Sequence, residues 1–444
     1  MSSELPDEQV VERLHAIVHP ATLAHMAATA PIDADLDFDM TNVEDIRDEK
    51  LLPALARLRE RAPVYWSERN RCWQISGYEQ VAAAFQDERF SNVRLSTFAF
   101  RSIPEAERER RIPNLQRYIK GWIVNVDGDT HRRLRSVATK ALSKKFVDSL
   151  RPLFEQLSQE LTEKAIRLRE CDYATEIAYF LPATVILKLL GLPLEHLEKV
   201  REWNRAITRA LAAVFAPADV LEAGDRAIAE MNAMLSVEIA KRRRRPQDDL
   251  LTQLTTLSDD VKGALSEEEV LGLCHILLTA GHETTVNSLV FGLIAWSKNP
   301  EQARRLLAGD VDPLTAMQEL LRYINMSTTQ PRVVAQDLEL CGQRLRRGDV
   351  AFLWIASANS DPNFFPEPGR LDLSRENISG ALTFGPGLHH CIGHYLARVE
   401  LEVFFRTFLP RFERIEILDD RLALLPNLSF RGLSQLNVRL TPRS

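Results

Sequence analysis

The chain has 444 residues and a formal net charge of −6, with 45% apolar and 27% charged residues. This length is enough for a fold that encloses a large cofactor, and the composition is ordinary for a soluble globular protein. The modest negative charge gives no reason to expect a nucleic-acid partner.

The cysteines are few and scattered. They form no Cys-x-x-Cys pair and are odd in number, which argues against a disulfide framework and against a zinc site. The polar, acidic N-terminus has no signal-peptide pattern, and no apolar run is long enough to span a membrane. We therefore expect a cytoplasmic protein without membrane association. The five cysteines are Cys72, Cys171, Cys274, Cys341 and Cys391.

Residues 1–36 show weak helical periodicity and an acidic segment, so we expect a loosely ordered arm there, followed by a single domain over residues 37–444. From Leu51 onward most segments have the apolar spacing of amphipathic helices. Two short runs, Val64–Trp66 and Cys72–Ile75, have the composition of paired strands. Long helical patterns then cover residues 127–142, 145–169, 173–190, 194–214, 219–245, 265–298 and 313–325.

Helix start signals support two of these segments. Asp127 or Asp129 is expected to cap the helix of residues 127–142, and Ser266 with Glu269 predicts a capping box at the start of the helix that ends at residue 298. After Pro331 the pattern changes to short strand-like runs, followed by a meander over residues 361–379, a helix to about residue 408 and a hairpin-like tail. Because no βαβ alternation is present, the sequence excludes a Rossmann-type or barrel enzyme and predicts a mainly α fold with small β regions.

The segment Phe-Gly-Pro-Gly-Leu-His-His-Cys-Ile-Gly, residues 384–393, surrounds Cys391. Gly385 and Gly387 allow the backbone to turn and to approach a flat group closely. Cys391 is expected near the start of the next helix, where the dipole and the free N–H groups favour a thiolate. Such a thiolate is a good soft ligand for a metal, and for haem iron in particular. A lone cysteine is usually a small buried apolar side chain, so the surrounding spacing carries the argument.

The spacing Phe-Gly-x-Gly-x-His-x-Cys-x-Gly-x-x-Leu-Ala-Arg, which runs through Arg398, resembles the haem-binding loop of the cytochrome P-450 family. The resemblance covers the chain from about Asp37 to its end. It implies the cytochrome P-450 fold, with haem b (iron protoporphyrin IX) between a long distal helix and the cysteine loop with its proximal helix. It also implies Cys391 as the metal ligand. Further cofactor-binding residues implied by this loop are Phe384, Gly385, His389 and Gly393.

The long central helix contains the run Ala-Gly-His-Glu-Thr-Thr at residues 280–285. Ala280 and Thr284 share a face, and Gly281 leaves room there for a small ligand. A structural alternative is a helix kink caused by the threonine hydroxyl bonding back to the backbone. The run resembles the distal-helix motif of the same family. It implies that Thr284 hydrogen-bonds dioxygen, that Glu283 relays protons, and that Ala280 borders the cofactor.

Glu319 and Arg322 are spaced i, i+3 and face the same way on a helix, but such a pair is common by chance and is usually an ordinary surface pair. Its place between the distal motif and the cysteine loop resembles the core ion pair of the family. The resemblance implies a third partner from the meander, and Arg370 is our prediction for it. The expected role of this network is structural, because it would hold the cysteine loop in place.

The run Thr-His-Arg-Arg-Leu-Arg at residues 130–135 places His131 and Arg135 on one helix face. A solvated basic face is the simple alternative. Haem carries two propionates that need cationic partners, and the resemblance implies His131, Arg135, Arg332 and His389 for that role. Further basic residues on this helix resemble the family's docking surface for an acidic electron carrier, although solubility alone would also account for them.

The family analogy also places a substrate pocket, with a mostly apolar lining that suits a medium-sized lipophilic molecule with some oxygens. Polyketide or macrolide intermediates, terpenoids or steroids, and fatty acids all remain open. The resemblance implies a haem-thiolate monooxygenase that inserts one oxygen atom from O2 by hydroxylation or epoxidation, with electrons from NAD(P)H through a ferredoxin or flavodoxin and its reductase. The pocket residues expected by analogy are Phe98, Leu277, Ala280, Thr328 and Leu428.

Two other functions are compatible with a haem-thiolate centre. A peroxide-driven peroxygenase is disfavoured because such enzymes usually lack the acid–threonine pair that Glu283 and Thr284 form here. A non-catalytic haem-thiolate binding or sensor protein is disfavoured by the distal motif and by the basic docking face.

Overall fold

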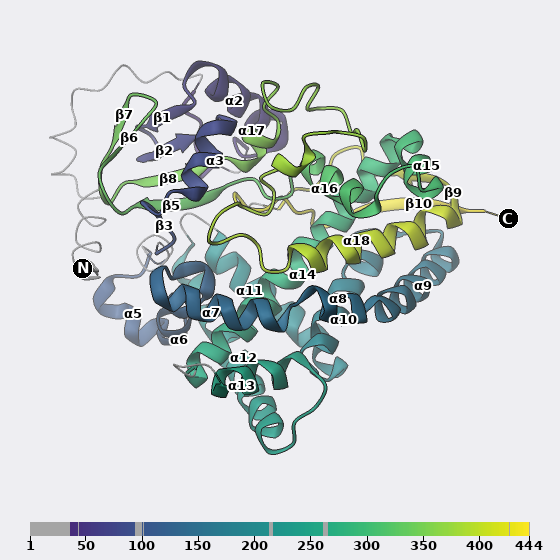
Figure 1. The fold of residues 1–444 in the computed structure, drawn as a ribbon, viewed down its shortest axis with the longest axis horizontal. Helices are drawn as coiled ribbons and strands as arrows, with labels where there is room; N and C mark the ends of the chain where they lie inside the picture. The colour runs from purple at the N-terminus through teal and green to yellow at the C-terminus, as the bar shows by residue number, and fades with distance from the viewer. Residues whose placement is uncertain are drawn as a thin grey trace.

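The computed structural model describes residues 36–42, 44–93, 100, 102–212, 216–260, 265–425 and 427–443. Except for Leu36, whose side chain is buried, the expected arm of residues 1–36 lies outside this part of the chain. Helices hold 59% of the structure and strands 11%, which confirms the predicted mainly α class. Figure 1 shows most of the strands gathered at one end with α2, α3 and α17, while the larger helices fill the rest of the molecule.

The helices and strands have the following bounds. The helices are α2 (Asp48–Arg61), α3 (Tyr78–Gln86), α5 (Glu105–Arg111), α6 (Pro113–Tyr118), α7 (Gly128–Ala141), α8 (Lys144–Ser149), α9 (Arg151–Leu168), α10 (Phe180–Leu189), α11 (Leu197–Ala212), α12 (Ala218–Arg244), α13 (Leu250–Asp260), α14 (Glu267–Lys298), α15 (Pro300–Ala308), α16 (Pro313–Ile324), α17 (Ile355–Asn359) and α18 (His394–Phe408). The strands are β1 (Val64–Ser67), β2 (Cys72–Ile75), β3 (Phe90–Ser91), β4 (Glu170–Asp172), β5 (Gln330–Val334), β6 (Leu338–Leu340), β7 (Gln343–Leu345), β8 (Val350–Leu353), β9 (Phe412–Ile417) and β10 (Asn437–Pro442).

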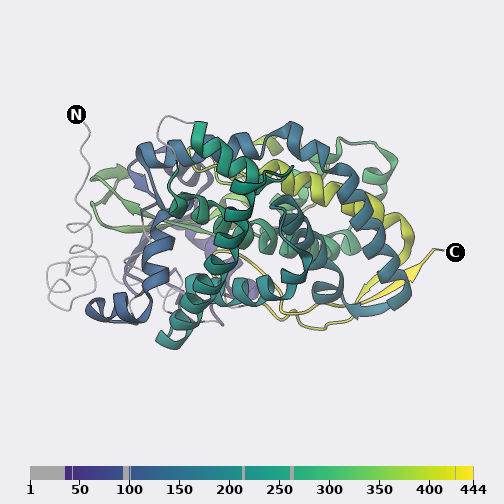
Figure 2. The same ribbon diagram turned by 90° about the horizontal axis from the view of Figure 1, so that it is seen from below.

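The largest sheet has the strand order β1-β2-β8-β5-β3. β1 and β2 form the antiparallel pair expected from the sequence, with Val64 opposite Ile75. β8 pairs in parallel with β2 and antiparallel with β5, which places Arg332 opposite Ala351. A second sheet, β4-β10-β9, lies at the other end of the molecule near the C-terminus, as Figure 2 shows. The sheet that contains β5 therefore lies beside the helices that carry the predicted site.

The central helix α14 begins as the sequence predicts. The Ser266 side chain accepts from the Glu269 N–H, and the Glu269 carboxylate accepts from the Ser266 N–H, which completes the capping box. Most of the helix is buried against α10, α16, α11 and α12, as its apolar composition all round requires. None of the helices in the described ranges is long and apolar enough to cross a membrane.

Two helix boundaries differ from the expected ones. The pattern over residues 145–169 is divided between α8 and α9, because Pro152 lies in the first turn of α9, where proline starts a helix readily. The pattern from residue 173 begins with a wider turn over Ala174–Ala178 before α10 starts. Both differences are changes at helix ends. The structure also contains helices for which the sequence analysis gave no pattern, among them α3, α5, α6, α13 and α15.

Candidate active site

The cysteine loop turns tightly just before α18. The Cys391 N–H donates to the Phe384 carbonyl oxygen at 2.9 Å, and Cys391 itself is exposed. Gly385 and Gly387 have positive φ angles of 62° and 91°. A Cβ atom at Gly387 would collide with the Phe85 carbonyl, and one at Gly385 would lie 3.3 Å from the Phe85 ring. The two glycines are therefore needed for the turn itself and for close contact with α3.

The surroundings of Cys391 both raise and lower the pKa of its thiol. Cys391 is exposed on one side, but the protein atoms around its other sides reduce the hydration of the thiol and so raise its pKa. The Gly393 N–H and the positive charge of Arg135 oppose that rise. Metal coordination removes the proton from a thiol outright. Since α18 begins only at His394, with Gly393 as the N-cap, the expected position of Cys391 at the start of the proximal helix is observed.

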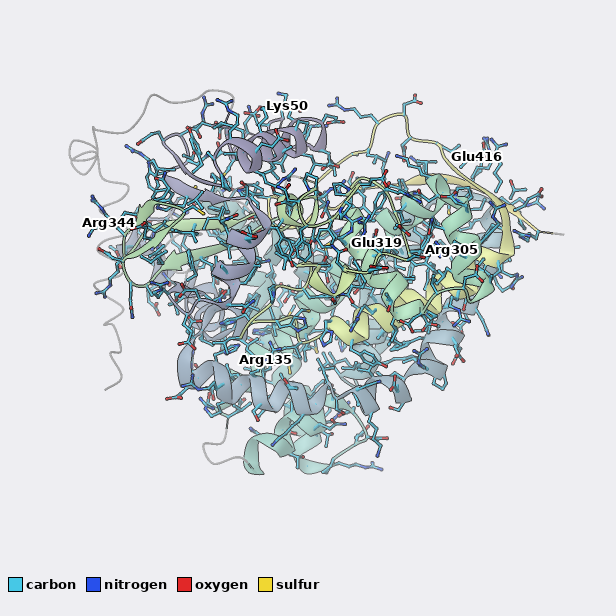
Figure 3. The ribbon with its side chains drawn as sticks, turned by 45° about the horizontal axis from the view of Figure 1, so that its top comes forward. Lys50, Arg135, Arg305, Glu319, Arg344 and Glu416 are labelled. Carbon is cyan, nitrogen blue, oxygen red and sulfur yellow. The ribbon has the colours of Figure 1, made fainter. Side chains whose placement is uncertain are left out.

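The four residues expected near the propionates lie around this loop. Arg135 donates a hydrogen bond to the His390 carbonyl oxygen, and the rings of His131 and His389 are 3.9 Å apart. Arg332 is buried, and its guanidinium carbon lies 5.1 Å from the centre of the Phe85 ring, against which the cysteine loop packs. Figure 3 labels Arg135 on α7. The structure thus brings all four side chains to one region.

His131 lies where the resemblance implies it. Burial, together with the positive charges of the neighbouring His389 and Arg135, lowers the pKa of His131 to about 4. A neutral imidazole can still donate one hydrogen bond, and an anionic partner raises the pKa of an imidazole. The propionate role of His131 stays a prediction.

Asp127 holds His389 in place, a function that the sequence argument missed. Asp127 was expected as a helix cap, but its side chain makes no capping bond to α7. Instead, its Oδ1 lies 2.9 Å from His389 Nε2, and its Oδ2 accepts from the Ser91 hydroxyl (2.5 Å) and the Asn92 N–H (3.0 Å). These contacts hold the pKa of Asp127 below its usual value despite burial. The carboxylate links β3, α7 and the cysteine loop.

The residues in this region fit haem b. Cys391 is an exposed soft ligand, Arg135 supplies positive charge close to it, and the buried Arg332 lies against Phe85, which the loop also contacts. Within the described residues, the buried His131 Nε2 atom has no hydrogen-bond partner, and a buried ring nitrogen of this kind needs an acceptor such as a carboxylate oxygen. At Gly393, a Cβ atom would meet nothing within 4 Å, so no protein contact in the described residues requires glycine there.

The middle of α14 is the part of that helix that is not covered. Leu277 and Thr284 are half-buried and Ala280 is exposed, whereas the helix is buried on either side of them. Their spacing of i, i+3 and i+7 puts them on one face, which we call the distal stripe. The room for a small ligand expected at Gly281 is taken by a neighbouring helix, because a Cβ atom there would lie 3.3 Å from Ile186 Cδ1 of α10. Thr284 Oγ1 donates to the Ala280 carbonyl oxygen at 2.8 Å, which is the hydrogen bond of the structural alternative. An open face with a hydroxyl is nevertheless present.

Glu283 does not lie on the distal stripe. Its Oε2 accepts from the Thr208 hydroxyl of α11 at 2.6 Å. Burial raises the pKa of Glu283, while the Thr208 hydrogen bond and the charge of Arg205 lower it. The predicted acid is therefore a desolvated carboxyl next to the stripe and in contact with a second helix.

The Glu319 network is buried at the centre of the molecule, as Figure 3 shows. Arg322 donates to both carboxylate oxygens of Glu319, at 2.7 and 2.8 Å. The predicted third partner, Arg370, is wrong: its side chain is exposed and pairs with Glu367 at 3.4 Å. Arg375 instead reaches Glu319 at 3.2 Å. Arg370 contributes only its carbonyl oxygen, because the meander turns its side chain outward.

The network reaches the cysteine loop through Asn359. Arg322 donates to the Asn359 carbonyl oxygen at 2.9 Å. The Asn359 side chain accepts from the Leu382 N–H at 2.8 Å and donates to the Thr383 hydroxyl at 3.1 Å. These two residues directly precede Phe384. The contacts supply a physical path for the expected structural role of the ion pair.

The predicted pocket residues are placed unequally. Leu277 and Ala280 lie on the distal stripe, whereas Phe98 lies outside the described residues. Leu428 is buried in an apolar cluster with Leu36, Leu55 and Trp354, so its side chain has no surface for a ligand. Thr328 is also buried, and its Oγ1 has no hydrogen-bond partner within the described residues.

Comparison with known proteins agrees with this geometry. The family model described as Cytochrome P450 matches residues 101–308 and 314–428. The chain is 33% identical over 396 residues to the cytochrome P450 monooxygenase PikC of Streptomyces venezuelae, covering 87% of this chain and 90% of that protein. It is 30% identical over 366 residues to the biotin biosynthesis cytochrome P450 of Bacillus subtilis, covering 82% and 89%.

A solved structure shows the same fold. Epothilone B-bound cytochrome P450epoK superposes with a TM-score of 0.81 at 29% sequence identity, covering 92% of this chain and 100% of that chain. With the family model matching well over half of the residues, the chain belongs to the cytochrome P450 family, is a monooxygenase of that family, and has haem b as its cofactor.

Proposed function

We propose that this cytochrome P450 monooxygenase hydroxylates or epoxidises a medium-sized lipophilic substrate of natural-product metabolism, with electrons from NAD(P)H through a ferredoxin or flavodoxin. The observation that carries the proposal is the distal stripe, an open face in the middle of a buried helix, with the desolvated carboxyl of Glu283 beside it. Terpenoid, steroid and fatty-acid substrates remain within this class. The five free cysteines suit a reducing compartment such as the cytoplasm.

The residues of the site have separate roles. Haem b, held by Cys391, supplies the dioxygen chemistry when bound, and a thiolate ligand favours cleavage of the O–O bond. His131, Arg135, Arg332 and His389 would hold its propionates, and the arginines would balance their charges. The Thr284 hydroxyl, which donates to the Ala280 carbonyl oxygen, would become a donor on the open face by turning away from that carbonyl, and Glu283 would deliver protons toward it as a general acid. The apolar side chains Leu277 and Ala280 orient the substrate and limit water.

The relatives support the proposed substrate class. One similar structure holds epothilone B, and another is a complex with an acyl carrier protein that carries hexadec-9Z-enoic acid. We therefore include both a macrolide and a fatty acid among the candidates. Arg132 and Arg133 of α7 pair with Asp129 and Glu269, so the exposed Lys140 and, on α8, Lys144 and Lys145 are the basic side chains that suit an acidic electron carrier, because complementary charge speeds association.

The deciding experiment is incubation of the holoenzyme under ¹⁸O2 with NADPH, a ferredoxin and its reductase. Epothilone D, dodecanoic acid and testosterone serve as the substrate panel. The expected result is a product that contains one ¹⁸O atom and that disappears in Cys391→Ser. If product forms from hydrogen peroxide alone and not from ¹⁸O2 with NADPH, the peroxygenase alternative replaces the proposal. Haem-loaded protein without any product would favour the sensor alternative.

A further inference from the structure

Two polar side chains of α11 contact the part of α14 that carries the distal stripe. Asn204 is buried; its Nδ2 donates to the Leu278 carbonyl oxygen at 3.0 Å and lies 3.4 Å from both ring nitrogens of His282. One turn further along α11, Thr208 Oγ1 donates to Glu283 Oε2 at 2.6 Å. One face of α11 therefore holds two consecutive polar residues of the distal helix.

The Thr208 hydrogen bond is important because Glu283 is half-buried and its carboxyl makes this direct contact with a second helix. Burial raises the pKa of Glu283, and the Thr208 hydroxyl is the first of the groups that lower it again. The exposed Arg205 acts on the carboxyl through its charge. Hydrogen bonds to a desolvated carboxylate are directional and stronger than those in water. Within the described residues, the Thr208 hydroxyl is the group that fixes where this carboxyl points.

The orientation of the Glu283 carboxyl matters because consecutive residues of a helix do not face the same way. Thr284 donates to the Ala280 carbonyl oxygen on the distal stripe, whereas the carboxyl of the preceding residue is turned to α11. To pass a proton to the stripe, the Glu283 side chain must rotate away from Thr208. A hydroxyl can donate to an ionised carboxyl and accept from a protonated one, so Thr208 can hold either form between transfers.

We propose that Thr208 is a positioning residue for Glu283, whose hydroxyl holds the carboxyl at α11 in a single orientation from which it turns to the distal stripe. The inference rests on the proton-relay role given to Glu283 under the proposed function. Without the hydroxyl the carboxyl samples several orientations, and proton delivery slows roughly tenfold. If Thr208 only fills space between the helices, the shape of the side chain matters and its hydroxyl does not.

The test uses five variants of the holoenzyme. Thr208→Val removes the hydroxyl but keeps the shape, and Thr208→Ser keeps the hydroxyl but loses a methyl group. Glu283→Gln and the double variant Thr208→Val/Glu283→Gln show whether Thr208 acts through the acid. Thr162→Val is the matched control, because the hydroxyl of this buried threonine bonds only within α9, to the Ser158 carbonyl oxygen, in the described structure.

NADPH consumption and hydrogen peroxide release are measured in H2O and D2O, with a ferredoxin and its reductase and with dodecanoic acid as the probe. We expect Thr208→Val to slow consumption roughly tenfold, to enlarge the solvent isotope effect and to raise the peroxide released per NADPH. Thr208→Ser and Thr162→Val should behave as wild type. The double variant should be no slower than Glu283→Gln. The carbon monoxide difference spectrum of each variant confirms that haem is bound.

Three outcomes overturn the proposal. The first is that Thr208→Val matches wild type in every readout. The second is that Thr208→Ser is as slow as Thr208→Val. The third is that the effects of Thr208→Val and Glu283→Gln multiply in the double variant. If Glu283→Gln itself matches wild type, the relay role fails first, and the inference fails with it. If the wild type makes product under ¹⁸O2 in the first experiment, the monooxygenase function survives all of these results.

Discussion

The two sides of the active site are held in different ways. On the proximal side, Glu319 is fully buried and bonded to Arg322 and Arg375, and further bonds through Asn359 lead to the cysteine loop. On the distal side, the carboxyl of Glu283 is held by one hydroxyl from a neighbouring helix. The first arrangement suits a support that stays fixed, and the second suits an acid that must change direction.

The difference also predicts two kinds of effect when a residue is substituted on one side or the other. Removal of one partner from a buried ion network leaves an uncompensated charge and costs about 3–5 kcal/mol of folding free energy. Loss of a hydrogen bond to a charged group lowers the free energy of unfolding by about 1.5–3 kcal/mol. On the distal side this loss would change the orientation of the Glu283 side chain alone. We therefore expect proximal substitutions to affect stability and cofactor binding, and distal substitutions to affect chemistry in a protein that stays folded.

The largest effect is expected at Cys391. Cys391→Ser replaces the soft thiolate by a poor ligand, so the thiolate-type Soret band of the reduced carbon monoxide complex should be lost completely. The matched control is Cys341→Ser, at an exposed cysteine in a turn away from the loop, which should leave the band unchanged. The same thiolate band in Cys391→Ser would contradict the assignment of the ligand.

The next effect tests the corrected ion network. Arg375→Ala removes a nearly buried partner of Glu319 and should lower the free energy of unfolding by about 3 kcal/mol. Arg370→Ala removes an exposed pair with Glu367 and should cost less than about 1 kcal/mol. Urea unfolding of the two variants under the same conditions measures both values. A greater loss for Arg370→Ala would restore the original sequence prediction.

A smaller effect is expected on the distal side. Thr284→Ala removes the hydroxyl that donates to the Ala280 carbonyl oxygen, a bond within α14 that adds little to folding. Stability should change by less than about 1 kcal/mol, while proton delivery should slow roughly 10²-fold and more peroxide should be released per NADPH. Thr284→Ser, which keeps the hydroxyl, is the control. Unchanged coupling in Thr284→Ala would remove Thr284 from the mechanism.

Local rules predicted much of the fold. The capping box of Ser266 and Glu269 and the β1–β2 pair depend on residues a few positions apart, and both are confirmed. The cysteine loop is also a local feature, since its two glycines and its cysteine lie within a few residues. Contacts between distant segments were harder to predict, because they depend on how helices pack.

Three residues illustrate that limit. The sequence offered two arginines in the meander, Arg370 and Arg375, and only the path of the folded backbone shows which one faces Glu319. Thr208 is 75 positions from Glu283, and an ordinary threonine in a helix carries no signal of such a contact. Asp127 had the signature of a helix cap, but long-range partners took its carboxylate instead.

On the proximal side, the buried carboxyl of Glu400 differs from that of Glu319 because it lacks a charged partner in the described part of the chain. Glu400 lies on α18 and is buried, and its Oε1 has no hydrogen-bond partner within the described residues. Burial without a positive partner raises the pKa of Glu400 from 4.5 to about 8. At neutral pH the folded protein therefore keeps a proton on Glu400 that the unfolded chain has released.

The difference in protonation of Glu400 between the folded and unfolded states determines whether stability rises or falls with pH. Below about pH 4.5 both states hold the proton, and the contribution of Glu400 to stability is fully present. Between about pH 4.5 and 8 only the folded state holds it, so the contribution falls by up to about 1.4 kcal/mol for each pH unit.

Glu400→Gln keeps the shape without the titration, so the free energy of unfolding should depend less steeply on pH than in wild type. Urea unfolding from pH 5.5 to 7.5 measures both slopes; Glu402→Gln, at a paired carboxylate two positions along α18, is the control. Equal slopes for wild type and Glu400→Gln would mean that Glu400 has a partner or water contact that keeps it ionised, and its carboxyl would then no longer differ from that of Glu319.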